Sequence, residues 1–304
     1  MTGKIGIELG LGWFPDYPDF RDFTQERDQV DNRLKKLDQR PIRDMVEQVG
    51  VLKAPERDLP GSKDLRRWCS PIENQRSLGS CTANAGIGLV EYYERRACGK
   101  HIDASRLFLY KTTRNLLHWT GDTGAFLRTT MAAMALFGVP PEEFWPYDIA
   151  EFEKEPPAFC YAFAQNYQSV QYFRIDPPNT SREKLLKRIK AYLACGLPSM
   201  FGFTVFNSIG QAGDDGKIPF PSKEDRAVGG HAVVAVGYDD KMKIVRSTTS
   251  QESIGALMIR NSWGPDWGEK GYGWLPYDYV LSGLAIDWWI LLKSEWIDTQ
   301  NFGL

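Results

Sequence analysis

Residues 74–85 read Asn74-Gln75-Arg76-Ser77-Leu78-Gly79-Ser80-Cys81-Thr82-Ala83-Asn84-Ala85, so that a Gln and a Gly lead into a single Cys. From Ala83 to Ala97 no Pro occurs, and apolar side chains recur at the spacing of a buried helix. Gly99 stands where a C-terminal cap is expected. Cys81 is therefore predicted to lie on the first turn of a helix, with Ser80 as its N-cap.

The first turn of a helix stabilises an anion, because its backbone N–H groups are unpaired and lie at the positive end of the helix dipole. A thiol attacks as its thiolate, and this position is expected to lower the pKa of Cys81 from about 8.5 toward neutrality. Cys81 is therefore predicted to be a nucleophile. The other four cysteines are interpreted as small buried hydrophobic residues.

The composition is that of an ordinary soluble protein, since 42% of the 304 residues are apolar and 25% are charged. The net charge of −2 gives no reason to expect nucleic acid or an anionic membrane as a partner. No stretch approaches the roughly 20 apolar residues of a membrane helix. The five cysteines include no C-x-x-C pair and the three histidines are far apart, so neither a metal nor a cofactor is expected.

The chain is predicted to have an N-terminal arm, residues 1–60, and a main domain, residues 61–304. Within the main domain three helices are expected first, at 83–97, 105–118 and 125–137. Then follow one helix, at 181–194, and six strands, at 169–175, 199–206, 232–236, 256–259, 271–275 and 288–292. Helices first and strands second favour an α+β fold, with a helical lobe at about 75–165 and a β-rich lobe at about 166–292.

The arm is rich in Pro and aromatic residues at 10–22 and is expected to be extended there. Short helices are expected at 26–36 and 42–49, and residues 55–63 are interpreted as a linker. Two hypotheses remain open for this region. The arm is either a structural element packed on the main domain, or a pro-segment that covers the active site until it is cut near the linker.

A nucleophilic Cys needs a base, and a base needs a partner that orients it. His231 follows Gly229-Gly230 and begins an apolar run, so its imidazole is predicted to stand at the edge of a strand. Thirty residues later comes Asn261, followed by the Trp263-containing, glycine-rich turn. An Asn carbonyl oxygen can accept a hydrogen bond from one imidazole nitrogen, and an indole above that bond would exclude water.

These motifs together resemble the papain-like cysteine peptidases, and in particular their bacterial members. The matching residues are Gln75, Gly79-Ser80-Cys81, Gly230-His231-Ala232, Val236-Gly237-Tyr238, Asn261-Ser262-Trp263-Gly264, Trp267-Gly268 and Gly271-Tyr272. The resemblance covers residues 65–292 and implies a two-lobed fold, with one helical and one β-barrel-like lobe and the active site in the cleft between them.

The resemblance also implies roles. Cys81 would be the nucleophile, His231 its partner and Asn261 the residue that orients the imidazole. Gln75 and the backbone N–H of Cys81 would form the oxyanion hole. Gly124 would hydrogen-bond the substrate backbone, and Phe126 would line a pocket for an apolar side chain two residues before the cut. The substrate-binding residues implied in this way are Gly79, Gly124, Phe126, Gly230 and Trp267.

The sequence also departs from the family pattern. Leu78 and Gly121 stand where the family usually has a disulfide pair, which fits folding in a reducing compartment. Thr82 replaces the usual aromatic residue, and the arm lacks the helical pattern of lysosomal pro-segments. The first 16 residues lack a secretory signal, so a cytoplasmic location is the default expectation, with export of a trimmed chain left open.

The leading prediction is a thiol endopeptidase, acting as a monomer on peptide or protein substrates and made as a zymogen. The first alternative is an exopeptidase, in which the 210–230 excursion or the tail blocks one end of the cleft. A second is a papain-like scaffold that binds without catalysis, which would have no need of all four polar site residues. A third is acyl transfer of the transglutaminase type, against which Asn261 counts because that chemistry typically uses Asp.

Overall fold

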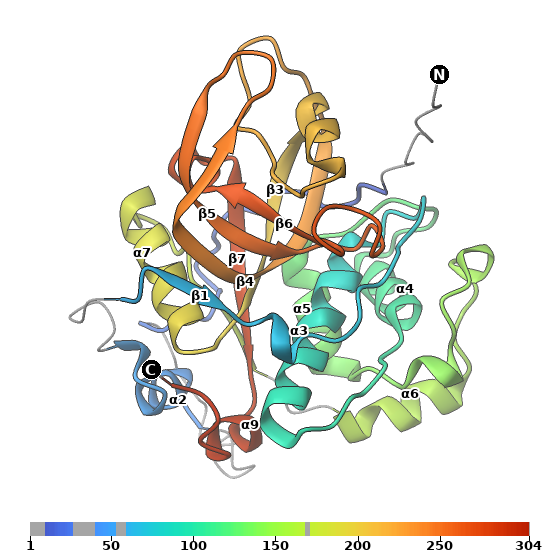
Figure 1. Ribbon diagram of the computed structural model, residues 1–304. Coiled ribbons are helices and arrows are strands. Elements are labelled where there is room, and N and C mark those ends of the chain that lie inside the picture. Colours follow the sequence, from blue (N-terminus) through green and yellow to red (C-terminus); the bar gives the residue numbers. More distant parts are fainter. Residues whose placement is uncertain (1–9, 27–39, 53–58, 168–170, 304) are drawn as a thin grey trace.

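Figure 1 shows the computed structural model, which describes residues 10–26, 40–52, 59–167 and 171–303. Helices α3, α4, α5 and α6 gather on one side, and an antiparallel sheet forms the other side with α7 against it. This arrangement confirms the α+β prediction. The predicted boundaries of the arm and the lobes stay predictions.

The helical side is built from α3 (Cys81–Cys98), α4 (Arg106–Leu117), α5 (Leu127–Phe137) and α6 (Ala158–Ala164). Helix α3 ends at Gly99, which has a left-handed backbone (φ 66°) that Gly adopts without strain. Helix α4 is capped by Ser105, whose side chain accepts a hydrogen bond from the backbone N–H of Phe108. The helices predicted at 83–97, 105–118 and 125–137 are confirmed, whereas α6 was not predicted.

The sheet has seven strands: β1 (Ser62–Asp64), β2 (Gln171–Arg174), β3 (Ser199–Phe206), β4 (Ala227–Val245), β5 (Glu252–Arg260), β6 (Tyr272–Pro276) and β7 (Ala285–Leu292). Their order is β2-β7-β3-β4-β5-β6, and β1 pairs with β4. In the described part of the chain this path is open, so the expected barrel-like lobe is a sheet that does not close. Strand β4 is much longer than the predicted run at 232–236. The apolar pattern marked only the middle of the strand, where consecutive residues are buried.

The remaining helices pack around these two parts. They are α2 (Ile42–Gln48), α7 (Arg182–Ala194), α8 (Tyr277–Leu281) and α9 (Ser294–Asp298), with short 3-10 turns at Arg66–Trp68, Glu142–Phe144, Ile149–Glu151, Gln165–Tyr167 and Asn207–Gly213. Helix α2 confirms the helix predicted at 42–49. The helix predicted at 26–36 lies almost wholly outside the described residues. The predicted linker at 55–63 ends in β1, and its residues 55–58 also lie outside the described part.

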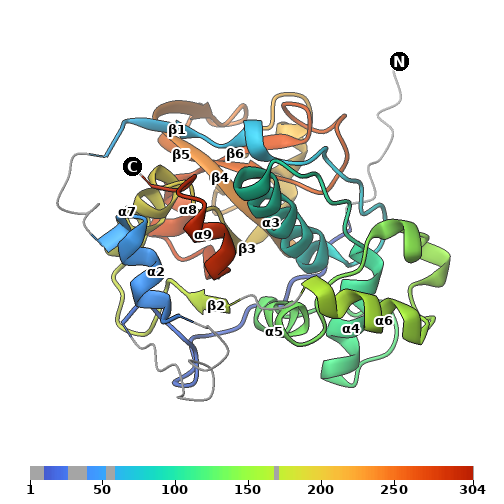
Figure 2. The same cartoon turned by 90° about the horizontal axis from the view of Figure 1, so that it is seen from below.

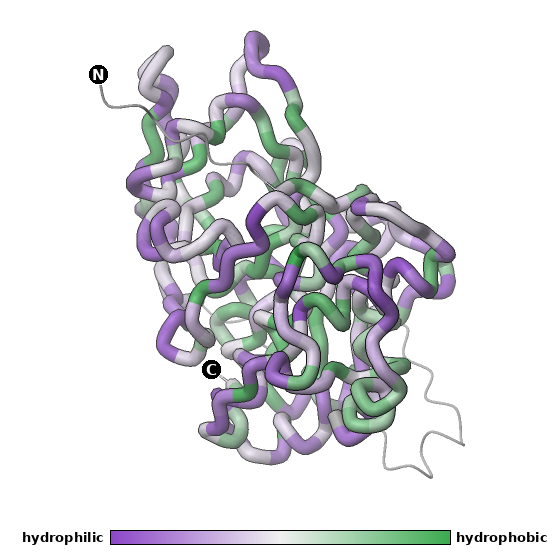
Figure 3. The backbone as a smooth tube through the Cα atoms, turned by 90° about the vertical axis from the view of Figure 1, so that its right-hand side faces the viewer, coloured by the Kyte–Doolittle hydropathy of each residue, from purple (hydrophilic) through white to green (hydrophobic). Residues whose placement is uncertain are grey.

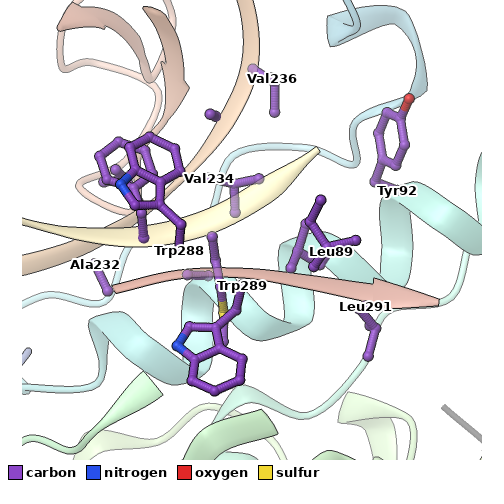
Figure 4. Packing of buried hydrophobic residues seen from close by; sticks show 14 of the residues in the cluster. Leu89, Tyr92, Ala232, Val234, Val236, Trp288, Trp289 and Leu291 are labelled. Atoms are coloured by element: carbon purple, nitrogen blue, oxygen red, sulfur yellow. The ribbon is translucent and has the colours of Figure 1, made fainter. Parts of the chain in front are cut away.

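The core lies where α3 packs against the sheet, chiefly against β4 and next against β3. In Figure 4, Leu89 of α3 lies near Val234 of β4, while Trp288 and Trp289 point to opposite sides of β7. Trp288 stacks on Phe201 with 3.8 Å between ring centroids. Each fully buried side chain of this kind contributes about 1.5–3 kcal/mol. The core therefore fixes the start of α3 relative to β4, which is the relationship the candidate site depends on.

Hydrophilic residues are frequent on the peripheral loops, and hydrophobic stretches run through the interior (Figure 3). In the part of the chain that the structure describes, no helix has both the length and the apolar character needed to cross a membrane.

Candidate active site

Cys81 is the first residue of α3 and its side chain is fully buried. The backbone N–H groups of Ala232, on β4, and of Gly12, on the N-terminal arm, lie close enough to its sulfur to favour the thiolate form. The contact with Ala232 brings the nucleophile predicted from one motif beside the His231 motif. Ser80 occupies the N-cap position, but its side chain does not cap the helix. Its hydroxyl instead contacts the Tyr147 hydroxyl at 2.6 Å.

His231 lies on β4, paired across the sheet with Phe203 of β3. Its Nε2 is 2.8 Å from Oδ1 of Asn261, which directly follows β5. The Trp263 indole stacks on the imidazole, with ring centroids 4.4 Å apart and planes at 20°. The imidazole is fully buried, and its Nδ1 has no hydrogen-bond partner among the described residues. One ring nitrogen is thus held by Asn261, and the other remains available for the thiol.

Gln75 is fully buried beside this pair. Ser262 holds it from two sides, since the Ser262 hydroxyl donates to Oε1 at 2.5 Å and the Ser262 carbonyl accepts from the Gln75 backbone at 2.8 Å. These contacts direct the Gln75 amide, whose Nε2 donates to the carbonyl of Leu78 at 2.8 Å and to that of Gly10 at 2.9 Å. A backbone carbonyl of the arm therefore lies on the predicted oxyanion donor.

Residues 10–14 of the arm cross the site and form an isolated β-bridge there. The Trp13 N–H donates to the Gly230 carbonyl at 3.2 Å. The Ala125 N–H donates to the Gly12 carbonyl at 2.8 Å and the Ala125 carbonyl accepts from Phe14 N–H at 3.2 Å, so Trp13 and Ala125 form a parallel bridge. The arm therefore packs on the main domain and covers the site, and the predicted cut near the linker stays a prediction.

Gly12 is the closest point of the crossing. A Cβ on Gly12 would lie 1.9 Å from the Gly79 carbonyl oxygen, so only glycine fits here. Beyond the crossing the arm is anchored by two ion pairs of Arg128, to Asp16 at 2.6 Å and to Asp22 at 2.8 Å. In Figure 2 the blue stretch of the arm continues past α5 and β2, where the Arg174 N–H donates to the Phe23 carbonyl at 2.8 Å.

With the arm over the site, the Cys81 thiol does not have the lowered pKa that its place at the helix start predicts. Burial raises the pKa of the Cys81 thiol to about 12, although the backbone N–H groups around it act in the opposite direction. Burial likewise lowers the pKa of His231 to about 4, against the effect of Asn261. The expectation of a lowered thiol pKa was wrong for this state, because removal of water outweighs the helix terminus. With the arm in place the pair is a neutral thiol and a neutral imidazole.

Of the residues predicted to bind substrate, all except Trp267 lie near the point where the arm crosses the site. Gly79 touches Gly12, Gly230 accepts from Trp13, and Phe126 packs on Phe14 with centroids 5.8 Å apart. Trp267 is buried beneath Trp263, at a centroid distance of 5.3 Å.

Gly124 lies against Gly12, but its N–H donates to the Tyr110 hydroxyl at 3.0 Å. In this structure the backbone partner of the arm is therefore the neighbouring Ala125. Sequence reasoning missed Ala125, and it also missed Asp287, whose carboxylate accepts from the Trp13 indole at 3.0 Å. No motif marks Asp287, because its place beside the site arises only from the pairing of β7 with β3.

Residues 59–285 match the family model described as papain family cysteine protease. The chain belongs to the papain family of cysteine proteases. An uncharacterised peptidase C1-like protein of Acanthamoeba polyphaga mimivirus is 35% identical over 302 residues, which cover 97% of this chain and 91% of that protein. Other relatives are longer, and the chain spans 64% of Peptidase 1 from Psoroptes ovis.

Among solved structures, xylellain, a cysteine protease from Xylella fastidiosa, superposes with a TM-score of 0.71 and 32% identity, covering 96% of this chain and 99% of xylellain. The proform of the ragweed pollen allergen Amb a 11 shares the fold, with a TM-score of 0.59 and 21% identity over 81% of this chain and 70% of its own. The mimivirus and Xylella proteins thus match nearly the whole chain, whereas the family model begins at residue 59.

Proposed function

We propose that the protein is a cysteine endopeptidase made as a zymogen, in which residues 10–14 of its own chain block the active site. The observation that carries the proposal is the crossing itself. This segment lies over Cys81, with one carbonyl on Gln75 and with backbone hydrogen bonds to Ala125 and Gly230. A peptide substrate needs such a backbone cradle next to a nucleophile.

The chemistry follows from the residues that the site brings together. Once the arm leaves, water enters, and the Cys81 proton passes to the free Nδ1 of His231, because thiolate and imidazolium stabilise each other. The thiolate attacks the peptide carbonyl carbon, and Gln75 donates to the oxygen as it becomes negative. The imidazolium then protonates the amine that leaves.

The second half of the cycle returns the enzyme to its starting state. The acyl group is now a thioester on Cys81. Neutral His231 takes a proton from water as the hydroxide adds to the thioester. The C–S bond then breaks, which releases the acid product and leaves the Cys81 thiolate beside the His231 imidazolium. Asn261 holds the ring through Nε2 during both halves, so that Nδ1 stays directed at the reacting atoms.

The path of the arm supports an endopeptidase over the exopeptidase alternative. Gly10 lies on the Gln75 side of Cys81, and the chain continues from Trp13 to Phe23 on the other side. The cleft thus accommodates a polypeptide that extends past the nucleophile in both directions. An exopeptidase would need one end of this path to be closed.

The experiment is hydrolysis of peptides blocked at both ends, with the intact mass of the protein followed in parallel. We expect cleavage of the blocked peptides and, with time, loss of the N-terminal region from the wild-type chain. Cys81→Ala should show neither. Hydrolysis restricted to peptides with a free end would replace the endopeptidase by the exopeptidase. Absence of all hydrolysis, even after the arm has been removed, would overturn the proposal.

A further inference from the structure

The Trp13 side chain fills a slot directly beside the catalytic pair. We define the Trp13 slot by Gly202, Gly230, Ala125 and Asp287. A Cβ on Gly202 would lie 1.9 Å from the indole, and a Cβ on Gly230 would lie 2.8 Å from it. The indole therefore lies directly on the backbone of two neighbouring strands, β3 and β4. Trp13 is only 5% exposed, so the slot takes up an entire indole.

The floor of the slot is polar. The Trp13 indole N–H donates to Oδ2 of Asp287 at 3.0 Å, and Asp287 is fully buried. The other oxygen, Oδ1, accepts from the Trp289 indole at 2.7 Å. The Asp287 backbone has a left-handed conformation (φ 66°) and its N–H donates to Asp176 at 2.9 Å. The carboxylate is thus held in one orientation, with one oxygen directed into the slot.

The slot belongs to the substrate cradle as well as to the arm. Gly230, which forms one wall, directly precedes His231, and its carbonyl binds the Trp13 backbone. Ala125, which forms the bridge with Trp13, would do the same for any extended peptide in this place. When the arm leaves, the slot opens next to Cys81 and the Asp287 oxygen loses its donor.

We propose that Asp287 makes the Trp13 slot select tryptophan in the peptide substrates of the released enzyme. This inference rests on the proposed function. The glycines select a flat, wide ring, and Asp287 selects a ring that carries an N–H donor. A phenylalanine or leucine side chain would leave the buried Asp287 oxygen without a partner, which is costly.

A basic side chain is the other chemistry that a carboxylate could bind. Here Arg174 already lies 3.2 Å from Asp287 and 2.9 Å from Asp176, and all three side chains are buried. A second cation would compete with Arg174 for the same carboxylate. A neutral N–H donor adds a hydrogen bond without that competition, so tryptophan is favoured over arginine or lysine.

The test compares end-blocked fluorogenic peptides that differ at one position near the cleaved bond. The full-length chain and its Trp13→Ala form, in which the slot is vacant, are assayed with Trp, Phe, Leu or Arg at each position in turn. We expect Trp to give the highest kcat/KM at one position, by about tenfold over Phe. Replacing Trp by 3-benzothienylalanine, which has the same shape but no N–H, should remove most of that preference.

A variant of the slot provides a second, independent test. Gly202→Ala would place a methyl group 1.9 Å from the position of the indole, so the ratio of kcat/KM for Trp peptides over Ala peptides should fall at least tenfold. A thermal melt checks that the variant is folded. Equal rates for Trp and benzothienylalanine, or a lead of Phe, Leu or Arg, would overturn the inference while leaving the peptidase in place. No hydrolysis of any peptide, even after the arm has been removed, would overturn the proposed function, and the inference with it.

Discussion

Trp13 and Asp287 are 274 residues apart in the sequence, and a hydrogen bond of 3.0 Å joins the indole N–H of one to the carboxylate of the other. The bond joins the N-terminal arm to β7, which is the last strand along the chain. Gly12, the neighbouring residue, lies against Gly79 and beside the Cys81 sulfur. The buried Trp13 side chain thus helps to hold residues 10–14 over Cys81.

Replacing Trp13 by Ala should loosen the cover. The substitution removes the whole buried indole, and large-to-small changes of this kind cost about 3–5 kcal/mol. We expect alkylation of Cys81 by iodoacetamide at mildly acidic pH to become at least tenfold faster, with the labelled site mapped by mass spectrometry. Tyr17→Ala is the matched control, because Tyr17 is on the same arm but 76% exposed, and it should label like the wild type. Equal labelling of all three proteins would mean that the arm does not control access.

The ionisation of the pair should depend on the same cover. With the arm in place burial raises the pKa of Cys81 to about 12 and lowers that of His231 to about 4, so neither group is charged between these values. The thiol ionises only as pH rises through its pKa. The wild type should therefore show no Cys81 thiolate absorbance from pH 5 to 9, measured as the difference from Cys81→Ala. In Trp13→Ala the thiolate signal should appear within this range, and its absence would contradict the proposed ion pair.

Cys81→Ala should abolish hydrolysis and leave the fold intact, because only this thiol lies beside His231 and Gln75. Cys98→Ala is the matched control, since Cys98 is exposed at the far end of the same helix, and the expectation that it is buried was wrong. It should retain the wild-type rate. Peptide hydrolysis and a thermal melt of each variant provide the measurement. Near wild-type turnover of Cys81→Ala would remove the nucleophile assignment.

Gln75 and Asn261 should differ in the size of their effects. Gln75→Ala removes a donor to the developing oxyanion, and we expect turnover to fall by about two orders of magnitude. Asn261→Ala leaves the Trp263 stack on His231, so part of the activity should remain. Both side chains are buried, so kcat is compared only for variants that melt cooperatively. Small and equal effects of the two substitutions would mean that the active site has been misplaced.

Much of the fold could be predicted from local patterns. Helix α3 begins at Cys81 and ends before Gly99, as the apolar spacing and the terminal glycine indicate. Strand β3 has the predicted bounds, Ser199–Phe206, because most of its residues are buried and apolar side chains recur along it. Elements with mixed patterns were predicted less well. The mostly exposed ends of β4 carry no strand signal and are ordered by pairing with β3 at one end and β5 at the other.

The site divides in a similar way. The sequence by itself determined which groups could act, because local motifs contain the thiol, imidazole and amide groups that the chemistry needs. These groups belong to Cys81, His231, Asn261 and Gln75. Their ionisation in this state was not predictable, because it depends on the water that the arm removes. Ala125 and Asp287 carry no motif at all.

The sequence by itself therefore determined the family, the order of the elements and the catalytic residue types, since these depend on spacing along the chain. Only the tertiary structure decided that residues 10–14 cover Cys81 and that Trp13 meets Asp287. Both contacts join segments far apart in the chain, and their free energies come from burial and from hydrogen bonds that exist only once the sheet has formed.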